Sequence, residues 1–478
     1  MLKKLTTWII LFCCVACGQQ DKQIVIFSTN DMHAHIDDYA KVAAYIEQER
    51  QKNPNVLVLS AGDLFSGNPI VDYCPKYGNG FPIIDLMNRI GYRFTAFGNH
   101  EFDYGQHILC DRMAQAEFPF LCANMTVNDS LCIKQPEPSA TIEIDGMKIG
   151  IISAIQIENV NGRLIPATHP DKVKGITFTN PVEALCALRE IRNQCDVFIA
   201  LTHTGIDTDK EIAERMPELD LIVGGHTHTK LDTGIIVNNV LITQANEYLK
   251  YIGKTTLTVR NGKVVERKNE LINLSKLRDE DESIKALIAK YHDESPMNEI
   301  IGEAGKQFDG KEALGNLMTD AIVNVHQTDF AFQNAGGVRI GKIEKGDLTM
   351  GKIYELDPFN NRIVIIEMKP DEIRSLIKNS YKRRNKRADL FVSGMTYKIF
   401  TKDGIAELVE MKMANGKLLD ENKYYRVGIN DYLASAYTYE HKKAPQITDK
   451  TSEETLVEYI RNKKQITPQY PRTEVVEK

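Results

Sequence analysis

The chain has 478 residues, which at about 150 residues per domain allows two or three domains. Hydrophobic residues make up 42% and charged residues 26% of it, and the formal net charge is −6, which is the balance of a globular protein with a sizeable core. A protein dedicated to nucleic-acid binding would carry a basic face, so this composition argues against nucleic acid as a partner.

The N-terminal residues predict an export signal. The apolar stretch Trp8–Ala16 follows two lysines and is itself followed by Cys17 and polar residues. The stretch is too short to cross a bilayer, which takes about 20 residues. The segment CVACG resembles a bacterial lipobox, which implies that residues 1–17 are a lipoprotein-type signal peptide and that Cys17 is lipidated; a plain cleaved signal is the alternative. No second apolar run could span a membrane, so a lipid would be the only anchor, on the periplasmic or the cell-surface side.

Six further cysteines all lie in the first half of the chain, and an exported protein can oxidise them. None has the CxxC spacing typical of a zinc cluster, so one to three disulfides and free buried thiols both remain open. These cysteines are Cys74, Cys110, Cys122, Cys132, Cys186 and Cys195.

The first half of the chain alternates short apolar runs with amphipathic stretches. Runs such as IVIFSTND (24–31) and VLVLSAGD (56–63) are continuously apolar over most of their length, which is typical of strands covered on both faces. Stretches such as 39–51 and 181–194 repeat apolar residues at three- and four-residue spacing, which predicts helices. The pattern indicates a layered α/β domain, which we place at residues 22–272.

A charged segment at 273–300 carries apolar residues spaced for one helix face, and we interpret it as a linker helix. A second, smaller α/β unit is predicted over 301–478. It contains a helical pattern at 312–326, and its last helix begins near Thr451 and Glu454, which have the spacing of a capping box.

Five predicted strands of the first unit are followed by side chains that can bind metals. The carboxyl ends of strands form the ligand crevice of an open α/β sheet, so residues distant in sequence can converge there. Imidazole with carboxylate and amide oxygens suits Zn, Mn, Co or Fe, and the set predicts two divalent ions. Taken singly, such an Asp is usually a helix cap or turn residue, and such a His is usually a surface or core residue. Five strand ends that are all followed by such residues favour a shared site. The residues are Asp31 and His33; Asp63; Asn99, His100 and Asp103; His203; and His226 and His228.

The motifs that contain these residues are NDMHAH, GDLFSG, GNHEFD, THTG and GGHTH, in that order between residues 30 and 228. They resemble the five blocks of the calcineurin-like metallophosphoesterases, specifically the exported 5′-nucleotidase branch that includes bacterial UDP-sugar hydrolases. The resemblance implies an αββα sandwich in the N-terminal domain and a metal-dependent hydrolase of phosphoric esters.

Residue roles follow from this resemblance. It implies that His100 faces the phosphoryl group, as general acid or as transition-state stabiliser, and that Asp103 fixes the orientation of its ring. Two ions about 3.5 to 4 Å apart can activate a water and clamp the attacking and leaving oxygens of an in-line displacement. The implied ligands are Asp31, His33 and His228 for one ion, Asn99, His203 and His226 for the other, and Asp63 as the bridge.

The second unit resembles the C-terminal substrate domain of the same family, through LGNLMTDA, QNAGGVR, LDPFNN, VSGMTY and INDYLAS. By analogy, Asn334 and Arg339 reach the substrate, and Arg339 pairs with phosphate oxygens through its planar fork. Phe359 and Tyr432 match the two aromatic residues that sandwich the base, and such stacking tolerates any base.

Two departures from the family pattern concern the substrate. The family's Gly-Gly-Asp, whose Asp holds the ribose hydroxyls, is absent, and Thr438 lies near that place. The family arginine before LGNL is also absent; Lys311 is the nearest replacement, although a point charge is not a bidentate fork. The basic run 382–387 is interpreted as a solvated loop, with a phosphate-attracting patch as the alternative.

The leading hypothesis is a 5′-nucleotidase that releases phosphate from nucleoside 5′-monophosphates. A 2′,3′-cyclic nucleotide phosphodiesterase or a UDP-sugar hydrolase would use the same ions, and a non-catalytic nucleotide- or metal-binding lipoprotein is the alternative from another class. His100 and Asp103 argue against a non-catalytic protein. Because the metals and the base clamp lie in separate domains, the resemblance also implies domain closure. The native metal and the oligomeric state are not predicted.

Overall fold

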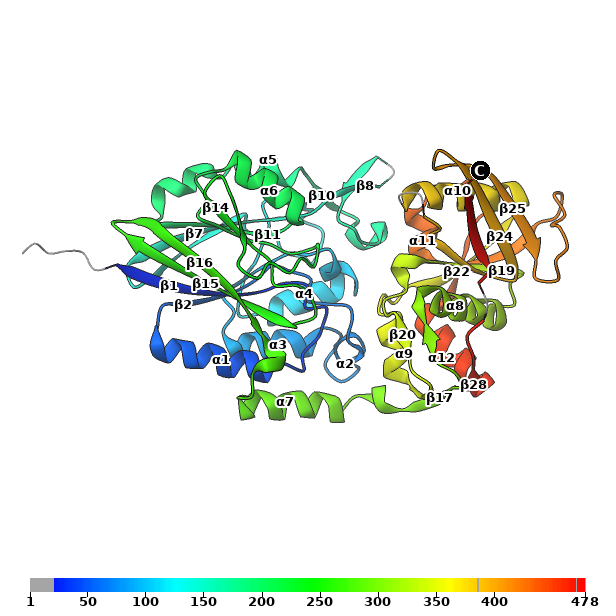
Figure 1. Ribbon diagram of the computed structural model, residues 1–478, viewed down its shortest axis with the longest axis horizontal. Coiled ribbons are helices and arrows are strands. Elements are labelled where there is room, and N and C mark those ends of the chain that lie inside the picture. Colours follow the sequence, from blue (N-terminus) through cyan, green and yellow to red (C-terminus); the bar gives the residue numbers. More distant parts are fainter. Residues whose placement is uncertain (1–20, 161, 385–386, 470, 478) are drawn as a thin grey trace, which may run out of the picture.

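The protein, described here by a computed structural model, has two lobes side by side (Figure 1). Helix α7 (Glu282–Asp293) lies along the lower edge of the first lobe in this view, and the chain then passes to the second lobe. No helix in the described part of the chain combines the length and the apolar character needed to cross a bilayer. The predicted signal peptide and Cys17 lie outside the described residues. The structure describes residues 21–160, 162–384, 387–469 and 471–477.

Two mixed six-stranded sheets form the N-terminal lobe. Each has a run of parallel strands, with antiparallel strands added at one edge or at both. The first sheet has the order β16 (Lys263–Asn273), β15 (Tyr251–Arg260), β1 (Lys22–Thr29), β2 (Val56–Ser60), β3 (Phe94–Ala96), β4 (Phe120–Leu121). The second sheet has the order β13 (Ile235–Val237), β14 (Val240–Thr243), β12 (Leu221–Val223), β11 (Val197–His203), β7 (Met147–Ile155), β6 (Ser139–Ile144).

The two sheets pack face to face, and helices cover their outer faces. Strand β1 shows why its sequence is continuously apolar: Ile24 and Ile26 lie between the sheets, whereas Val25 and Phe27 face the helical layer. The order of layers is therefore helix, sheet, sheet, helix, and the predicted αββα sandwich is confirmed. The first helical layer contains α1 (Tyr39–Lys52), α2 (Pro69–Asp72), α3 (Phe81–Ile90) and α4 (Gln106–Gln115), and the second contains α5 (Pro181–Cys186) and α6 (Ile206–Arg215).

Short elements complete this lobe. Two two-stranded ladders pair β5 (Met125–Val127) with β10 (Ile176–Phe178), and β8 (Glu158–Val160) with β9 (Arg163–Ile165). The 3₁₀ helices are η1 (His100–Phe102), η2 (Pro170–Val173), η3 (Arg189–Gln194) and, beside α7, η4 (Leu274–Lys276) and η5 (Pro296–Asn298).

The helix predicted over 181–194 is divided, which corrects the prediction. It forms α5 and then η3, whose residues are all at least partly exposed. Without burial, little packing energy favours a continuous α-helix there.

One disulfide joins Cys110 of α4 to Cys132, with 6.0 Å between their Cα atoms. Among the described residues, the other four cysteines are free, so the sequence alternatives resolve to one bridge with free thiols. These free cysteines are Cys74, Cys122, Cys186 and Cys195.

The linker helix α7 packs on α1 through one face, with Ile284, Ile288 and Tyr291 buried. Its first turn is capped by the Asp281 carboxylate, which accepts hydrogen bonds from two backbone N–H groups. The helix predicted at 273–300 is thus present, but shorter, because a 3₁₀ turn lies at each side of it.

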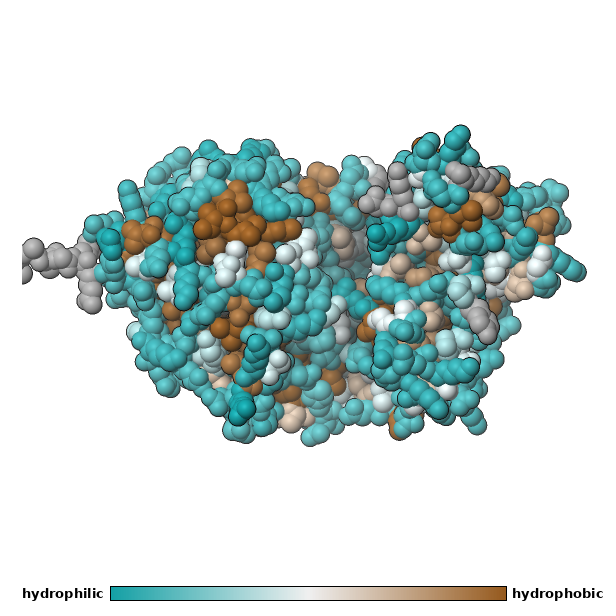
Figure 2. All heavy atoms as spheres, in the orientation of Figure 1, coloured by the Kyte–Doolittle hydropathy of each residue, from teal (hydrophilic) through white to brown (hydrophobic). Residues whose placement is uncertain are grey.

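Figure 2 shows that the surface of both lobes is mostly hydrophilic on the viewed side, with hydrophobic side chains in separate patches.

The second lobe is built on a five-stranded sheet. The main sheet of the second lobe has the order β23 (Leu390–Ser393), β19 (Phe330–Asn334), β26 (Tyr425–Asn430), β22 (Arg362–Met368), β27 (Gln446–Thr451). Its smaller ladders are β25 (Ile405–Met413), β24 (Met395–Lys402) and β29 (Thr473–Glu477); β21 (Gly346–Thr349), β17 (Ile300–Ala304) and β28 (Gln465–Ile466); and β18 (Phe308–Asp309) with β20 (Lys342–Ile343). Its helices are α8 (Gly310–His326), η6 (Ala335–Gly337), α9 (Met350–Leu356), α10 (Pro370–Arg383), α11 (Asp431–Ala436) and α12 (Ser452–Lys463), the last with the predicted capping box at Thr451 and Glu454.

Candidate active site

The seven predicted metal-binding residues converge where strands of the two sheets end. Five of the seven have a positive φ, between 46° and 80°. This left-handed conformation is costly for residues other than glycine, and it is concentrated at functional sites. The residues are Asp31 and His33 after β1, Asp63 after β2, Asn99 after β3, His203 at the end of β11, and His226 and His228 after β12.

Three of these histidines direct the same ring nitrogen into the site. Nδ1 of His33 and Nδ1 of His203 each lie near a backbone carbonyl oxygen, at 3.1 Å and 2.7 Å. Nδ1 of His228 lies 2.5 Å from Oε2 of Glu247. Because an acceptor oxygen faces each Nδ1, that nitrogen carries a proton and Nε2 is left to bind a ligand.

The Nε2 atoms are arranged as metal ligands would be. Nε2 of His33 lies 3.1 Å from Nε2 of His228. Nε2 of His203 is buried without a hydrogen-bond partner, 3.2 Å from Oδ2 of Asp63. Imidazole lone pairs at such distances repel unless they share a cation or a proton, and nitrogen with carboxylate oxygen is a donor set for divalent transition metals. The residues therefore fit the two ions that the sequence implies.

The donors fall into two groups that share Asp63. Within each group the ligand atoms lie within 4.8 Å of one another. The amide oxygen of Asn99 lies 3.0 Å from Nδ1 of His226 and so adds to the second group. The first group is Asp31, His33, Asp63 and His228, and the second is Asp63, His203 and His226.

Burial and charge set the protonation of these groups. Burial lowers the pKa of His33 well below its ordinary value and that of His226 to about 3, so both are neutral, as metal ligands must be. Burial also acts to lower the pKa of His203, but Asp63 outweighs it and raises the pKa to about 10. A proton on His203 occupies the place that a cation beside Asp63 would take.

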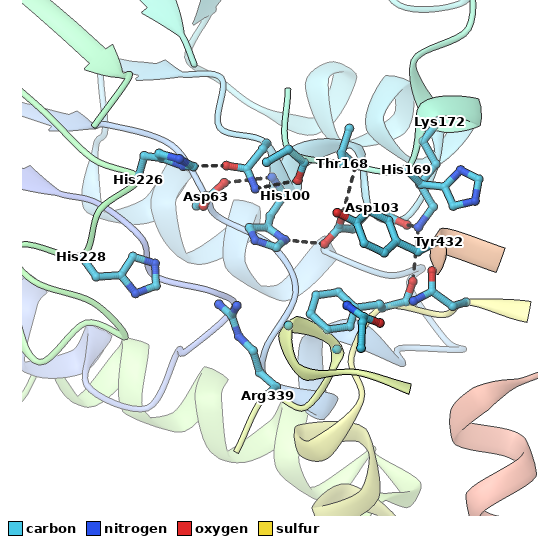
Figure 3. A pocket seen from close by; sticks show the side chains of 17 residues that line it. Asp63, His100, Asp103, Thr168, His169, Lys172, His226, His228, Arg339 and Tyr432 are labelled. Atoms are coloured by element: carbon cyan, nitrogen blue, oxygen red, sulfur yellow. Dashed lines mark hydrogen bonds and ion pairs between the residues drawn. The ribbon is translucent and has the colours of Figure 1, made fainter. Parts of the chain in front are cut away.

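His100 and Asp103 form a hydrogen-bonded pair beside the donors. Nδ1 of His100 lies 2.6 Å from Oδ2 of Asp103 (Figure 3). Burial lowers the pKa of His100, but the carboxylates of Asp103 and Asp63 raise it above its ordinary value. Burial likewise raises the pKa of Asp103, and His100 more than offsets that effect. The pair thus stabilises an imidazolium whose Nε2 is available to a substrate.

A cavity of about 310 Å³ joins the two lobes at this point (Figure 3). The first lobe contributes His100, Asp103 and part of the donor set. From the second lobe come all four residues that the sequence assigns to the substrate. These four are Asn334, Arg339, Phe359 and Tyr432.

Some expected residues do not line the cavity. Neither Lys311 nor Thr438, the replacements suggested for the absent family residues, is among the side chains that line it. The basic run begins in a helix and not in a loop, because α10 extends to Arg383. Arg383 is exposed, as a solvated residue would be, with its guanidinium 3.2 Å from the Tyr432 hydroxyl and over the Tyr437 ring.

Other cavity residues were missed by the sequence analysis. His169 lines the wall together with Thr168, Lys172 and Asn361. Glu101, next to His100, accepts hydrogen bonds from the backbone N–H groups of the Asp63 turn. Only the place of Glu101 inside the GNHEFD motif could have signalled a role.

Comparisons with known proteins agree with this architecture. Residues 24–230 match the family model of the calcineurin-like phosphoesterases, and residues 297–439 match that of the 5′-nucleotidase C-terminal domain. The chain is 27% identical to the 5′-nucleotidase of Diplobatis ommata, covering 89% of this chain and 84% of that protein. The structure of the 5′-nucleotidase precursor of Thermus thermophilus matches with a TM-score of 0.80 and 27% identity, over 95% of this chain and 99% of that one.

A further relative is much longer than this chain. The trifunctional nucleotide phosphoesterase protein YfkN of Bacillus subtilis is 28% identical over 86% of this chain, which spans 32% of that protein.

The αββα lobe with its two donor groups and its His–Asp pair defines the domain of a calcineurin-like metallophosphoesterase. The second lobe specifies the family within this class of proteins. The chain belongs to the family in which such a domain is followed by a 5′-nucleotidase C-terminal domain, and the resemblance found in the motifs is confirmed.

Proposed function

We propose that the chain is a metal-dependent phosphohydrolase that releases phosphate from nucleoside 5′-monophosphates. One observation carries the proposal: a single cavity has the His100–Asp103 pair on one wall and Arg339, Phe359 and Tyr432 on the other. The first wall suits a phosphoryl group, and the second suits a phosphate attached to a flat base. The activity named for the 5′-nucleotidase relatives supports the same substrate class.

In this proposal the two donor groups hold two divalent ions, Zn, Mn, Co or Fe. When bound, the ions supply Lewis-acid stabilisation of the phosphoryl oxygens and lower the pKa of a water. The proposed ligands are Asp31, His33 and His228 for one ion, Asn99, His203 and His226 for the other, and Asp63 for both.

The residues of the chain then position the substrate and move a proton. As a water oxygen forms a bond to phosphorus and the bond from phosphorus to the ribose 5′ oxygen breaks, Nε2 of His100 donates its proton to that leaving oxygen, while Asp103 holds the ring through Nδ1. Nε and Nη2 of Arg339 are buried without hydrogen-bond partners, so they are available to phosphate oxygens. Phe359 and Tyr432 stack on the base.

The test is phosphate release by the purified chain from AMP, ATP, UDP-glucose, 2′,3′-cyclic AMP and an aryl phosphate, with Mn or Zn and with a chelator. We expect chelator-sensitive release that is fastest from AMP. Faster turnover of the cyclic nucleotide or of UDP-glucose would favour the corresponding alternative. Release from the aryl phosphate alone would contradict the assignment of the base site.

Export and lipid anchoring at Cys17 are also part of the proposal. The wild-type chain should incorporate a fatty-acid label in a bacterial host and partition with membranes. The Cys17→Ala variant should lose both properties. Release of the wild-type chain into the aqueous fraction without label would favour a plain cleaved signal.

A further inference from the structure

Lys172 connects the two walls of the cavity. It lies in η2, on the first lobe, and its Nζ donates a hydrogen bond to the backbone carbonyl oxygen of Asp103 in the same lobe (Figure 3). The same Nζ lies 3.2 Å from the backbone carbonyl oxygen of Phe359 in the second lobe. A single ammonium group therefore holds the main chain of the residue that orients His100 and the main chain of the residue proposed to stack on the base.

Both carbonyls belong to backbone segments that position a ring. Asp103 closes the 3₁₀ turn η1, because its N–H donates to the carbonyl oxygen of His100, so a bond to Asp103 fixes the turn that carries the imidazole. Phe359 follows the last turn of α9 and its ring lies 6.1 Å from that of His100, measured between centroids. A shift of either segment changes the distance between the two rings.

The surroundings favour a lysine at this place. An ammonium group has three donors, so it can bond two carbonyl oxygens at once. Asp357, two residues before Phe359, is buried, and its Oδ2 has no hydrogen-bond partner. Burial raises the pKa of Asp357 to about 6, and the Lys172 ammonium acts in the opposite direction by stabilising the charged carboxylate.

The segment that carries Lys172 is itself held against the second lobe. Nδ1 of His169 accepts a hydrogen bond from the N–H of Asp171 and so caps η2. Nε2 of His169 lies 3.1 Å from the hydroxyl oxygen of Ser435 in α11. The position of Lys172 between the lobes is thus set from both sides.

We propose that Lys172 is a positioning residue that couples docking of the nucleobase on Phe359 to the placement of the His100–Asp103 pair. The proposal rests on the proposed nucleotidase function. A base stacked on Phe359 stabilises the backbone segment around this residue. Because Lys172 binds the carbonyl group of Phe359 and that of Asp103, the stabilised segment also fixes the position of the turn that carries His100. A phosphate ester without a base gains nothing from the coupling.

A double-mutant cycle on the full chain tests the coupling. The variants are Lys172→Met, Phe359→Ala and the double variant, each assayed with AMP and with an aryl phosphate. In the wild-type background, Phe359→Ala should lower kcat for AMP about 10-fold, and in the Lys172→Met background it should leave kcat for AMP unchanged. Lys172→Met should lower kcat for AMP by a larger factor than kcat for the aryl phosphate, which has no base to stack on Phe359.

Two further variants serve as controls for the loss of a lysine side chain at this place. Lys174→Met is the matched control, since Lys174 lies two residues away in an exposed ion pair with Asp171, and it should behave as wild type with both substrates. Lys172→Gln keeps two N–H donors on a shorter side chain and should retain part of the coupling. If Lys172→Met lowers kcat equally for both substrates, or if its effect and that of Phe359→Ala simply multiply, the proposal is overturned.

Hydrogen exchange gives a readout that does not depend on turnover. Lys172→Met should speed amide exchange at residues 100–105 and at 357–361 together, and a change confined to η2 would overturn the proposal. If the proposed function itself is wrong, a different result is expected. The wild-type chain would then show no preference for AMP that depends on Phe359, whatever the exchange data show.

Discussion

The ring of Phe359, from the second lobe, lies almost parallel to the ring of His100, from the first, with 6.1 Å between centroids and 28° between planes. A residue assigned to base recognition therefore lies beside the residue assigned to proton transfer. In the proposed function, this geometry brings a stacked base close to the His100–Asp103 pair.

Replacing His100 by Ala should lower kcat for AMP by about 10²- to 10⁴-fold, because the proton donor is lost. Its ring belongs to neither donor group, so the metal content should not change. Turnover and metal analysis on the same preparation check this. A variant that keeps full activity would show that His100 is not the proton donor, whereas absence of turnover by the wild-type chain would support a non-catalytic binding protein.

Replacing Phe359 by Ala should lower kcat/KM for AMP by about 5- to 150-fold, the range expected for the loss of one base–aromatic stack. The aryl phosphate should be hydrolysed as before, because it has no nucleobase to stack. Steady-state kinetics with both substrates provide the measurement. Ile405→Ala, at an exposed residue of the same lobe, is the control and should change neither value.

Glu247→Ala should weaken metal binding by about 10- to 100-fold, because the carboxylate that holds Nδ1 of His228 at 2.5 Å orients this ring. Competition with a chelator of known affinity measures the effect. Glu270→Ala, which removes an exposed carboxylate of β16, should leave the affinity unchanged. Equal affinities in the two variants would show that His228 needs no partner.

The ion pair between His292 of α7 and Asp37 should make stability depend on pH. Their hydrogen bond, 2.6 Å between Nε2 and Oδ1, raises the pKa of His292 above 6.5 and lowers that of Asp37. The contribution of His292 is therefore complete below pH 6.5 and is lost as the pH rises through its raised pKa. That of Asp37 is lost only when the pH falls through its lowered pKa.

Because both side chains are partly exposed, the pair should add about 0.2 to 1 kcal/mol to the unfolding free energy. His292→Gln should remove this at pH 6 and have little effect at pH 9, as measured by denaturant unfolding. His107→Gln, at an exposed histidine of α4, is the control. A difference that grows with pH would contradict the assignment.

The sequence predicted the layers, and it singled out donor residues that the structure brings together, because each carries a strong local signal. Strands buried on both faces have continuously apolar sequences, and Asp31, Asp63 and His203 stand at their carboxyl ends. Lys172 gave no such signal, because its partners are backbone carbonyl groups that are distant in sequence. Glu247 escaped notice for a similar reason, since its role depends on a loop that folds back on His228.

The error at 181–194 has a related origin. The spacing of apolar residues there suits a helix, yet η3 buries none of its residues, and periodicity alone does not reveal how much of a face is covered. For Arg383 the charge of its neighbours suggested a loop, whereas α10 continues to this exposed residue and its guanidinium contacts two tyrosines of the second lobe.

The cavity draws the groups proposed for the reaction from one lobe and those proposed for recognition from the other, and each lobe has its own hydrophobic clusters. Tyr432 packs against a cluster of the second lobe, whereas α9, just before Phe359, also packs on the first lobe through Met350 and Tyr354. The choice of leaving group is thus placed mainly in the second lobe, while Lys172 keeps it tied to the turn that carries His100.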